Sequence, residues 1–333
     1  MTEPTPPGPL PLEPMDPQLK WIQPGGGVVC RLELAWGRWR RFWLKTFRPG
    51  YVRRMAATRQ GAVNGCPHEV IDPRDVKFFR NQPGYYWAPE HDPFRWRDKI
   101  PFARSGLAEL FVFSVITFGP AALLALWLAG PGDNIAWPLL AAGWLAVATL
   151  AVIGSLIVWF FRDPPRRVPA DIDLVVSPAD GKVVAIDDIE DDDFVGGPAV
   201  HIGIFLSIFN VHINRAPVTG RVVGVRYKPG KYLNALRPES ARENEQLSVR
   251  MQETAAPYRR FVVRQITGAI ARRIVCWLKP GDELARGEQF GMIKLGSRTE
   301  LILPRDGLTI HAKIGDKVKA GRSVLAAYTA NDQ

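Results

Sequence analysis

The 333-residue sequence has few of the residues that define several common protein classes. Its three cysteines, Cys30, Cys66 and Cys276, are far apart, so the sequence disfavours a disulfide framework and predicts unpaired thiols in a reducing compartment. The first 20 residues are rich in proline and lack the apolar core of a signal peptide. Neither a Walker-type nor a dinucleotide-binding glycine-rich loop is present, so we expect no bound nucleotide.

Metal ligands are equally sparse. Cys66 and His68 could bind a metal, but no second Cys/His pair follows at the spacing of a zinc finger, and His91 is isolated. They lie in a turn-rich segment, residues 65–101, with Pro or Gly every few positions. We therefore predict no metal site.

Positive charge is abundant. The formal net charge is +10, which indicates either an anionic membrane surface or a nucleic acid as partner. Residues 31–59 contain nine Lys or Arg against one acid, Glu33, with six aromatic residues among them. Aromatic rings beside cations suit the headgroup layer of a membrane, although the same composition could stack on nucleic acid. We favour the membrane, because of the residues that follow, and expect no nucleic acid.

Two long runs carry no charge. Leu110–Ala129 and Ile135–Phe161 each reach the length of about 20 residues that crosses a bilayer as a helix. Only residues 130–134 separate them, so the sequence predicts a transmembrane hairpin over residues 105–161, with a kink at Pro120. A buried helical pair in a soluble protein fits these runs poorly.

The residues that flank the hairpin predict its orientation. Arg104 and the basic segment precede it, Arg162, Arg166 and Arg167 follow it, and the turn has no Lys or Arg. The positive-inside rule places both ends in the cytoplasm. We therefore divide the chain into a disordered proline-rich tail (1–30), a basic aromatic membrane-proximal region (31–104), the hairpin (105–161) and a cytoplasmic domain at the inner membrane (162–333).

The sequence pattern of the C-terminal domain predicts mainly β-structure. Short β-branched runs alternate with Gly, Pro and Asp. Two similar turns, residues 281–287 and 315–321, are typical of the flattened β-sandwich of biotinyl and lipoyl carrier domains. No attachment lysine lies at a hairpin tip, however, which argues against a carrier. The predicted fold is thus a sandwich-like β domain after a two-helix hairpin.

The pair Gly296-Ser297 falls between two alternating runs, so we expect it at a junction of strands. Glycine allows a bend that exposes the peptide carbonyl, and serine is a nucleophile when a base activates it. Most Gly-Ser pairs are ordinary turns. Asp180 lies in an Asp-Gly turn and His212 in an apolar strand, where each is also compatible with a purely structural role.

Three segments taken together resemble the phosphatidylserine decarboxylase family. They are SPADGKV (177–183), FNVHINRAPVTG (209–220) and GMIKLGSRTELILP (291–304). The short form of that family also has a two-span hairpin that ends in Phe-Phe-Arg-Asp-Pro, here residues 160–164. The resemblance covers residues 100–333, so the first 100 residues are an N-terminal extension.

The resemblance implies a proenzyme that cleaves itself between Gly296 and Ser297. Ser297 would become a covalent pyruvoyl cofactor at the start of a 37-residue chain, residues 297–333, which stays associated with residues 1–296. The pyruvoyl carbonyl would form a Schiff base with the amine of phosphatidylserine and take up the electrons released with CO2, which gives phosphatidylethanolamine. The implied partners are phosphatidylserine and inner-leaflet lipid, and a homodimer is left open.

The resemblance also implies roles for polar residues. Asp180 matches the relay Asp in the SPxDG turn of the family's longer form. The relay His of that form falls on Arg215 here, and His212 matches its other His, so we assign the base to His212 as the one His of the motif in this chain. Arg298 and Arg215 are candidate ligands for lipid phosphate.

Three alternatives stay open. The substrate could be another serine phospholipid of the archaetidylserine type, which presents the same amine and carboxylate. Ser297, His212 and Asp180 could form a hydrolase triad, although Ser297 is not in a Gly-x-Ser-x-Gly elbow. The domain could also be a non-enzymatic membrane-anchored module.

Overall fold

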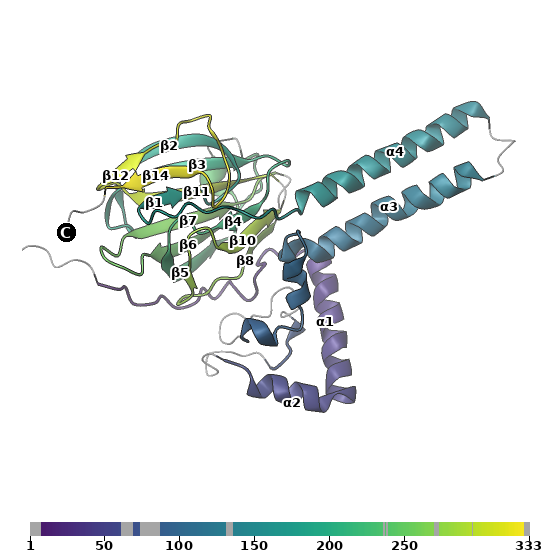
Figure 1. Cartoon of the computed structure of the whole chain (residues 1–333), viewed down its shortest axis with the longest axis horizontal. Helices are drawn as coiled ribbons and strands as arrows, with labels where there is room; N and C mark the ends of the chain where they lie inside the picture. The colour runs from purple at the N-terminus through teal and green to yellow at the C-terminus, as the bar shows by residue number, and fades with distance from the viewer. Residues whose placement is uncertain are drawn as a thin grey trace, which may run out of the picture. The chain divides into compact units, whose positions relative to one another are not determined.

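The computed structural model describes residues 8–60, 69–73, 87–130, 136–235, 237, 239–269, 273–294 and 296–329. Cys66 and His68, singled out as a metal-ligand pair, lie outside these residues. The chain divides into two compact units (Figure 1). One is Trp96–Pro164, and the other comprises residues 1–95 together with residues 165–333.

The smaller unit contains two long apolar helices. They are α3 (Leu107–Ala129) and α4 (Trp137–Phe160), preceded by the short 3-10 helices η3 (Arg95–Lys99) and η4 (Arg104–Gly106). α3 continues through Pro120. The two helices pack closely, since a Cβ added at Gly154 would overlap the ring of Phe118. This arrangement fits the predicted hairpin.

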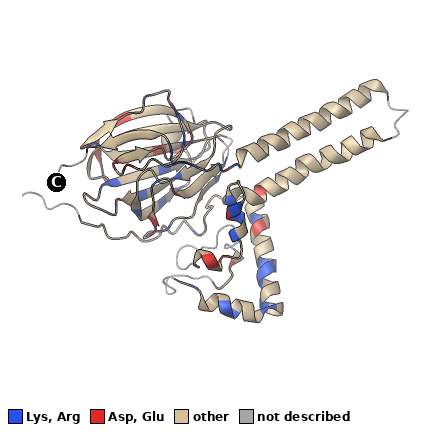
Figure 2. Ribbon diagram, in the orientation of Figure 1, with Lys and Arg blue, Asp and Glu red and all other residues tan. Residues whose placement is uncertain are grey.

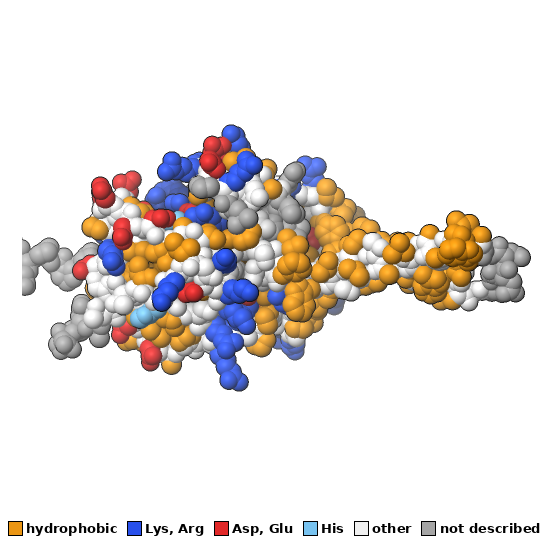
Figure 3. Space-filling model, turned by 90° about the horizontal axis from the view of Figure 1, so that it is seen from above, with side chains coloured by type: hydrophobic (Ala, Val, Ile, Leu, Met, Phe, Trp, Pro, Cys, Tyr) orange, Lys and Arg blue, Asp and Glu red, His pale blue; other side chains and the backbone are white. Residues whose placement is uncertain are grey.

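The surface of the two helices is apolar. Both are long and apolar enough to cross a membrane, and within the most apolar window of each only 11% and 6% of the residues are buried. Figure 3 shows many hydrophobic side chains along the side of the two helices that is in view. An apolar surface of this size on a pair of helices points to membrane association.

The larger unit is built mainly from β-strands. They are β1 (Leu174–Val176), β2 (Gly181–Asp192), β3 (Gly197–Leu206), β4 (Ile213–Arg215), β5 (Gly220–Lys228), β6 (Gln246–Gln252), β7 (Arg260–Ile266), β8 (Arg273–Cys276), β9 (Glu283–Leu284), β10 (Gln289–Lys294), β11 (Ser297–Pro304), β12 (Leu308–Ile310), β13 (Lys317–Val318) and β14 (Val324–Tyr328). A four-residue helix, α5 (Ser240–Glu243), lies between β5 and β6.

Eight of these strands form a curled sheet in the order β13-β2-β3-β11-β7-β6-β5-β9 (Figure 1). Two smaller sheets have the orders β4-β10-β8 and β1-β14-β12. Alternate residues of the strands pack into one main core that includes Ile204, Val249, Val263 and Leu301. The predicted fold class, a mainly β domain that follows two apolar helices, is confirmed. The acidic run 187–194 is part of strand β2 as far as Asp192.

The larger unit also holds the basic helices. α1 (Val28–Phe47) carries Lys and Arg along its length (Figure 2), and α2 (Pro49–Ala57) follows it. A short 3-10 helix, η2 (Pro89–His91), comes later. Residues of this region form a small apolar cluster of Leu44, Met55, Ile71 and Trp87. The aromatic rings predicted for a membrane surface stay exposed on α1: Trp36, Trp39, Phe42, Trp43 and Phe47.

The proline-rich tail differs from the prediction. Over residues 8–27 it lies against the β domain instead of being disordered, and Val28 already begins α1. The Glu13 carboxylate accepts from Arg226 Nε at 2.8 Å and from Arg250 Nη1 at 2.9 Å. The composition does predict a segment that cannot fold alone. These contacts come from strands more than 200 residues away, which composition does not reveal.

The tail continues to the small sheet that precedes the Gly-Ser pair. The carbonyl of Ile22 accepts a hydrogen bond from the N–H of Cys276 on β8, at 2.9 Å. The Gln23 side chain accepts from the buried Lys294 ammonium at 3.0 Å. Lys294 ends β10, so the N-terminal extension fixes the strand that leads to Gly296.

Candidate active site

Gly296-Ser297 lies where the chain leaves one sheet and enters another. β10 belongs to the three-stranded sheet and ends at Lys294, whereas β11 begins at Ser297 between β3 and β7 of the large sheet. Gly296 has a φ of 60°, a left-handed conformation that glycine adopts at little cost. The expected strand junction is therefore confirmed.

Strand β11 has two distinct faces. Leu301 and Leu303 pack in the main core, whereas Ile302 belongs to a separate cluster with Ala199 and Val262. Because side chains alternate along a strand, Ser297 and Thr299 share the core side with Leu301. We call this the inner face of β11, and the side that carries Arg298, Glu300 and Ile302 its outer face.

His212 is bound to the glycine of the pair. Its Nε2 accepts a hydrogen bond from the Gly296 N–H at 3.2 Å, and its Nδ1 lies 2.9 Å from the carbonyl oxygen of Asn210. A carbonyl can only accept, so Nδ1 carries the proton and Nε2 carries the lone pair. Both partners therefore select the neutral tautomer, whose basic nitrogen is bound to the peptide N–H that enters Gly296, one residue before Ser297. The structure brings these two predicted sites together.

The hydroxyl group of Ser297 is available to a base. Its side chain is completely buried, and among the described residues its hydroxyl has no hydrogen-bond partner. An unsatisfied buried hydroxyl costs about 1–3 kcal/mol and calls for an explanation. A nucleophilic role explains the missing hydrogen bond, because the Ser297 hydroxyl must stay available to a base and is therefore not held by a structural partner.

A neutral hydrogen-bonded network includes Thr299, the next residue after Ser297 on the inner face. Thr299 Oγ1 accepts from Asn214 Nδ2 at 3.0 Å, and Asn214 Oδ1 accepts from Gln265 Nε2 at 2.9 Å. All three side chains are fully buried. Sequence reasoning did not single out Asn214 or Gln265, since neither lies in a recognisable catalytic pattern.

Gly268 is a second residue that sequence reasoning missed. A Cβ added there would overlap the carbonyl oxygen of Gly296. The carbonyl of the Gly-Ser peptide therefore lies directly against the backbone at Gly268, where only glycine leaves room. Nothing distinguishes Gly268 in the sequence from the other 29 glycines.

Asp180 lies at the same end of the sheet. Lys182 of β2 pairs with Phe205 of β3, which pairs with Arg298 of β11. The Asp180 turn is therefore level with Ser297 and two strand spacings away, about 10 Å. Its carboxylate accepts both Arg166 Nη2 (3.0 and 2.9 Å) and the N–H of Ala320 (2.8 Å).

From the sequence, Arg166 was considered only as one of the positive charges that flank the hairpin. In the structure the side chains of Arg166 and Asp180 are 7% and 9% exposed, so they form a buried ion pair. Burying two charges is favourable only when they satisfy each other. The relay role of Asp180 stays a prediction, and Arg166 is the residue that holds its carboxylate.

The two candidate phosphate ligands make contacts within the protein. Arg298 Nε lies 2.9 Å from Glu300 Oε1, and Arg215 Nη1 donates to the carbonyl of Gly287 at 3.0 Å. Arg298 is also 93% buried. Their assignment to lipid phosphate stays a prediction, and each would have to give up or share a contact to fulfil it.

Glu300 is the centre of the charges on the outer face. Arg264 Nη1 donates to it at 3.0 Å, and His201 Nε2 lies 3.2 Å from it. The Nδ1 of His201 also lies 3.2 Å from Asp187 Oδ2. Burial alone raises the pKa of Glu300, but contact with His201 and the charges of Arg264 and Arg298 outweigh it and lower the pKa.

Comparison with known proteins agrees with this geometry. A model of the family described as phosphatidylserine decarboxylase matches residues 153–326, about half of the chain. A phosphatidylserine decarboxylase proenzyme of Rhodopirellula baltica is 51% identical over 254 residues, which cover 76% of this chain and 99% of the relative.

Two further relatives carry the same description. The proenzyme of Syntrophus aciditrophicus is 37% identical over 239 residues (72% of this chain and 100% of the relative), and that of Nitrosomonas eutropha is 43% identical over 189 residues (56% and 85%). The first two relatives are matched over almost their whole length, while about a quarter of this chain lies outside the match. This difference is consistent with an N-terminal extension.

Proposed function

The chain belongs to the phosphatidylserine decarboxylase family, whose members are carboxy-lyases, and we propose that it converts phosphatidylserine into phosphatidylethanolamine and CO2 with a pyruvoyl group made from its own Ser297. The observation that carries this proposal is the contact of His212 with the residue before Ser297. His212 Nε2 accepts from the Gly296 N–H at 3.2 Å, and the adjacent Ser297 has a buried hydroxyl with no hydrogen-bond partner among the described residues.

In the proposed self-cleavage, His212 Nε2 exchanges its hydrogen bond with the Gly296 N–H for one with the Ser297 hydroxyl and takes the hydroxyl proton. Oγ then attacks the carbonyl carbon of Gly296, so that the peptide C–N bond is replaced by an ester. Removal of the Ser297 Cα proton then breaks the Cβ–Oγ bond. This leaves a carboxylate on Gly296 and dehydroalanine at position 297, which takes up water and releases ammonia to become the pyruvoyl group.

The surroundings of Ser297 fit such a group. The Thr299, Asn214 and Gln265 side chains that line the inner face are neutral and buried, so they exclude water without placing a fixed charge beside position 297. Once formed, the pyruvoyl group supplies a carbonyl that condenses with the substrate amine and accepts the electrons released with CO2. His212 Nε2 is the group placed to return a proton to the carbon that loses CO2.

The two products are expected to stay together. In the 37-residue piece, β11 pairs with β3 on one side and with β7 on the other. β12 and β14 pair with each other, β14 also pairs with β1, and β13 pairs with β2. Cutting the chain before Ser297 removes none of these pairings.

The substrate is proposed to be reached at the cytoplasmic face of the inner membrane. α3 and α4 supply the anchor, and the positive-inside rule sets the orientation. The exposed aromatic rings and the cations of α1 suit an anionic leaflet. A serine lipid of the archaetidylserine type has the same amine and carboxylate and is the alternative substrate.

A hydrolase triad is less well supported. Ser297 is not in a Gly-x-Ser-x-Gly elbow, and the relatives that match the chain are described as decarboxylase proenzymes.

The intact mass of the purified protein tests the proposal. The chain of 37.1 kDa should resolve into two pieces, the smaller about 4 kDa with a pyruvoyl group at its start. Ser297→Ala should stay a single, inactive chain, while Ser323→Ala in the same C-terminal segment should be cleaved normally. An active wild-type protein that remains one chain, or decarboxylation by Ser297→Ala, would overturn the mechanism. Offering serine lipids with different apolar chains to the wild-type enzyme separates the two substrate classes.

A further inference from the structure

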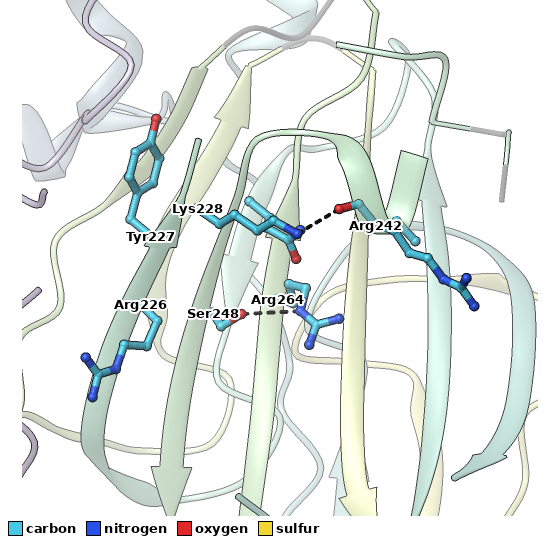
Figure 4. Close-up of a pocket in the computed structure, with 8 residues that line it drawn as sticks. Arg226, Tyr227, Lys228, Arg242, Ser248 and Arg264 are labelled. Atoms are coloured by element: carbon cyan, nitrogen blue, oxygen red, sulfur yellow. Dashed lines mark hydrogen bonds between the residues drawn. The ribbon is translucent and has the colours of Figure 1, made fainter. Parts of the chain in front are cut away.

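The outer side of the large sheet contains a pocket that the proposed reaction does not use. Its volume is about 370 Å³, and its lining includes four cations and no acid. The polar residues of the lining are Arg226, Lys228, Arg242, Gln246, Ser248 and Arg264. In Figure 4, Lys228, Ser248 and Arg264 lie in the middle of this group, with Arg226 on one side and Arg242 on the other.

The register of three neighbouring strands builds this pocket. Arg226 of β5 is opposite Ser248 of β6, which is opposite Arg264 of β7. Side chains that are directly opposite in a sheet lie on the same face. The Lys228 ammonium donates to the carbonyl of Arg242 at 2.9 Å, which fixes the α5 segment over the sheet. The cations are therefore brought together by the fold, not by one flexible loop.

Much of the hydrogen-bonding capacity of these cations is unused. Arg226 binds Glu13 through Nε, and Arg264 binds Ser248 and Glu300 through Nε and Nη1. In the part of the chain that the structure describes, Arg226 Nη1 and Nη2, Arg264 Nη2 and the whole Arg242 guanidinium have no partner. These N–H groups and the Lys228 ammonium are strong donors for an oxyanion.

From these observations we propose that the pocket binds a phosphate group, either in the headgroup of an anionic phospholipid or as free phosphate. A phosphate offers several acceptor oxygens and negative charge, and it matches guanidinium forks on more than one side. Arg226 and Arg264 are already paired with Glu13 and Glu300, whereas Lys228 and Arg242 have no acidic partner among the described residues, so an entering anion would compensate their charge.

The phosphate in this pocket does not belong to the lipid that reacts at position 297. Lys228 of β5 pairs with Gln246 of β6, Gln246 pairs with Ile266 of β7, and Ile266 pairs with Arg298 of β11. These pairings put the pocket at the end of the sheet where Ser297 lies. The pocket spans β7, β6 and β5, one to three strand spacings or about 5–15 Å from β11, and it lies on the outer face with Arg264 and Glu300, whereas Ser297 is on the inner face. In a serine lipid the amine and the phosphorus are about four bonds apart, or about 5 Å. The site therefore takes a second anion.

Titration of the full chain in neutral-detergent micelles tests the proposal. The probes are dihexanoyl phosphatidylglycerol, dihexanoyl phosphatidylcholine and inorganic phosphate, each measured by calorimetry, and none requires turnover. We expect Arg242→Gln to weaken binding of the anionic probe about tenfold, as the loss of one charge-assisted contact implies. Lys313→Gln removes one charge from an exposed turn elsewhere and should leave binding unchanged.

The probes distinguish the two sources of phosphate. Binding of phosphatidylglycerol, with inorganic phosphate much weaker, assigns the site to a lipid headgroup, and equal binding of both assigns it to free phosphate. Binding of neither anion overturns the proposal. Equal weakening by Arg242→Gln and Lys313→Gln also overturns it, because the attraction would then come from net charge alone. Since Arg242 is exposed and its side chain holds no structural contact, we expect its variant to fold and to be cleaved like the wild type.

Discussion

The two faces of strand β11 differ in charge, although their residues alternate along the same strand. On the inner face, Ser297 and Thr299 lie in a buried, neutral environment. On the outer face, Arg298 and Glu300 belong to a buried network of charges that also includes Arg264. The side chains alternate within a single strand, so one residue of backbone, about 3.3 Å, separates Ser297 from the charged Arg298.

This difference shows how a reactive serine can be placed rigidly without being bound. Hydrogen bonds to the Ser297 hydroxyl would position it but would also stabilise it in the resting state. The position of β11 is instead set by its pairing with β3 and β7 and by Glu300, which joins Arg264 of β7 to His201 of β3. We infer that the outer face holds the strand in place, while the inner face leaves the hydroxyl available to His212.

The largest contrast between the two faces should come from two histidines. His212→Gln removes the lone pair that faces the scissile peptide, and we expect self-cleavage to slow by about 10²- to 10⁴-fold, the usual contribution of a general base. His201→Gln changes a histidine on the outer face and should alter the rate by less than about twofold. The conversion of full-length chain into two pieces, followed over time on a denaturing gel, measures both.

Similar cleavage rates for the two variants would contradict the difference proposed between the two faces of β11. If His212→Gln matured normally, another residue would be the base, and Asp180 would be the first to examine. If His201→Gln were equally slow, the charge network would take part in the chemistry instead of supporting it.

Features that depend on local pattern could be predicted from the sequence. The two helices follow from uncharged runs of sufficient length, and the strand junction at Gly296 follows from the alternation on either side of it. His212 came from the family resemblance, and the structure adds its tautomer and its contact with Gly296.

Features that depend on pairing between distant segments could not be predicted. Gln265 meets Asn214 only because β7 and β4 lie on opposite sides of the core, 51 residues apart in sequence. The ion pair of Arg166 with Asp180 and the contact of Glu13 with Arg250 also join segments that no periodicity connects. The tail looked disordered because its partners are on the sheet and not within the tail.

The next effect should be on stability and should come from the outer face. Glu300→Gln leaves Arg264 and Arg298 without their buried counter-charge, and we expect it to lower the free energy of unfolding by about 3 kcal/mol. The gel assay should still show cleavage. Urea denaturation of the detergent-solubilised chain, followed by near-UV circular dichroism, measures the loss.

The pH dependence of this loss has a definite sign. Because the pKa of Glu300 is lowered in the folded protein, its stabilisation is fully present above the unfolded-state value of about 4.3 and is lost as the pH falls through the lower folded value. The wild type should therefore lose stability at acid pH more steeply than Glu300→Gln. Asp188→Asn, which breaks an exposed pair with Arg305, is the control and should cost less than about 1 kcal/mol. Parallel acid curves for the wild type and Glu300→Gln would contradict the role given to this carboxylate.

The smallest effect should come from the neutral network itself. Thr299→Val keeps the shape of the side chain but removes the oxygen that accepts from Asn214 Nδ2, which would then keep only a 3.4 Å contact with the carbonyl of Pro178. We expect a loss of about 1–2 kcal/mol in the free energy of unfolding, since one buried amide donor loses its best acceptor. Cleavage should slow by no more than about threefold, because the backbone pairing of β11 and not the Thr299 hydroxyl positions Ser297. Thr299→Ser restores the oxygen and should recover most of the stability. The opposite result would be that Thr299→Val slows cleavage as much as His212→Gln while it unfolds at nearly the wild-type urea concentration. The network would then take part in the reaction. Thr299 and Asn214 would have to be counted with Ser297 among the reactive groups of the inner face.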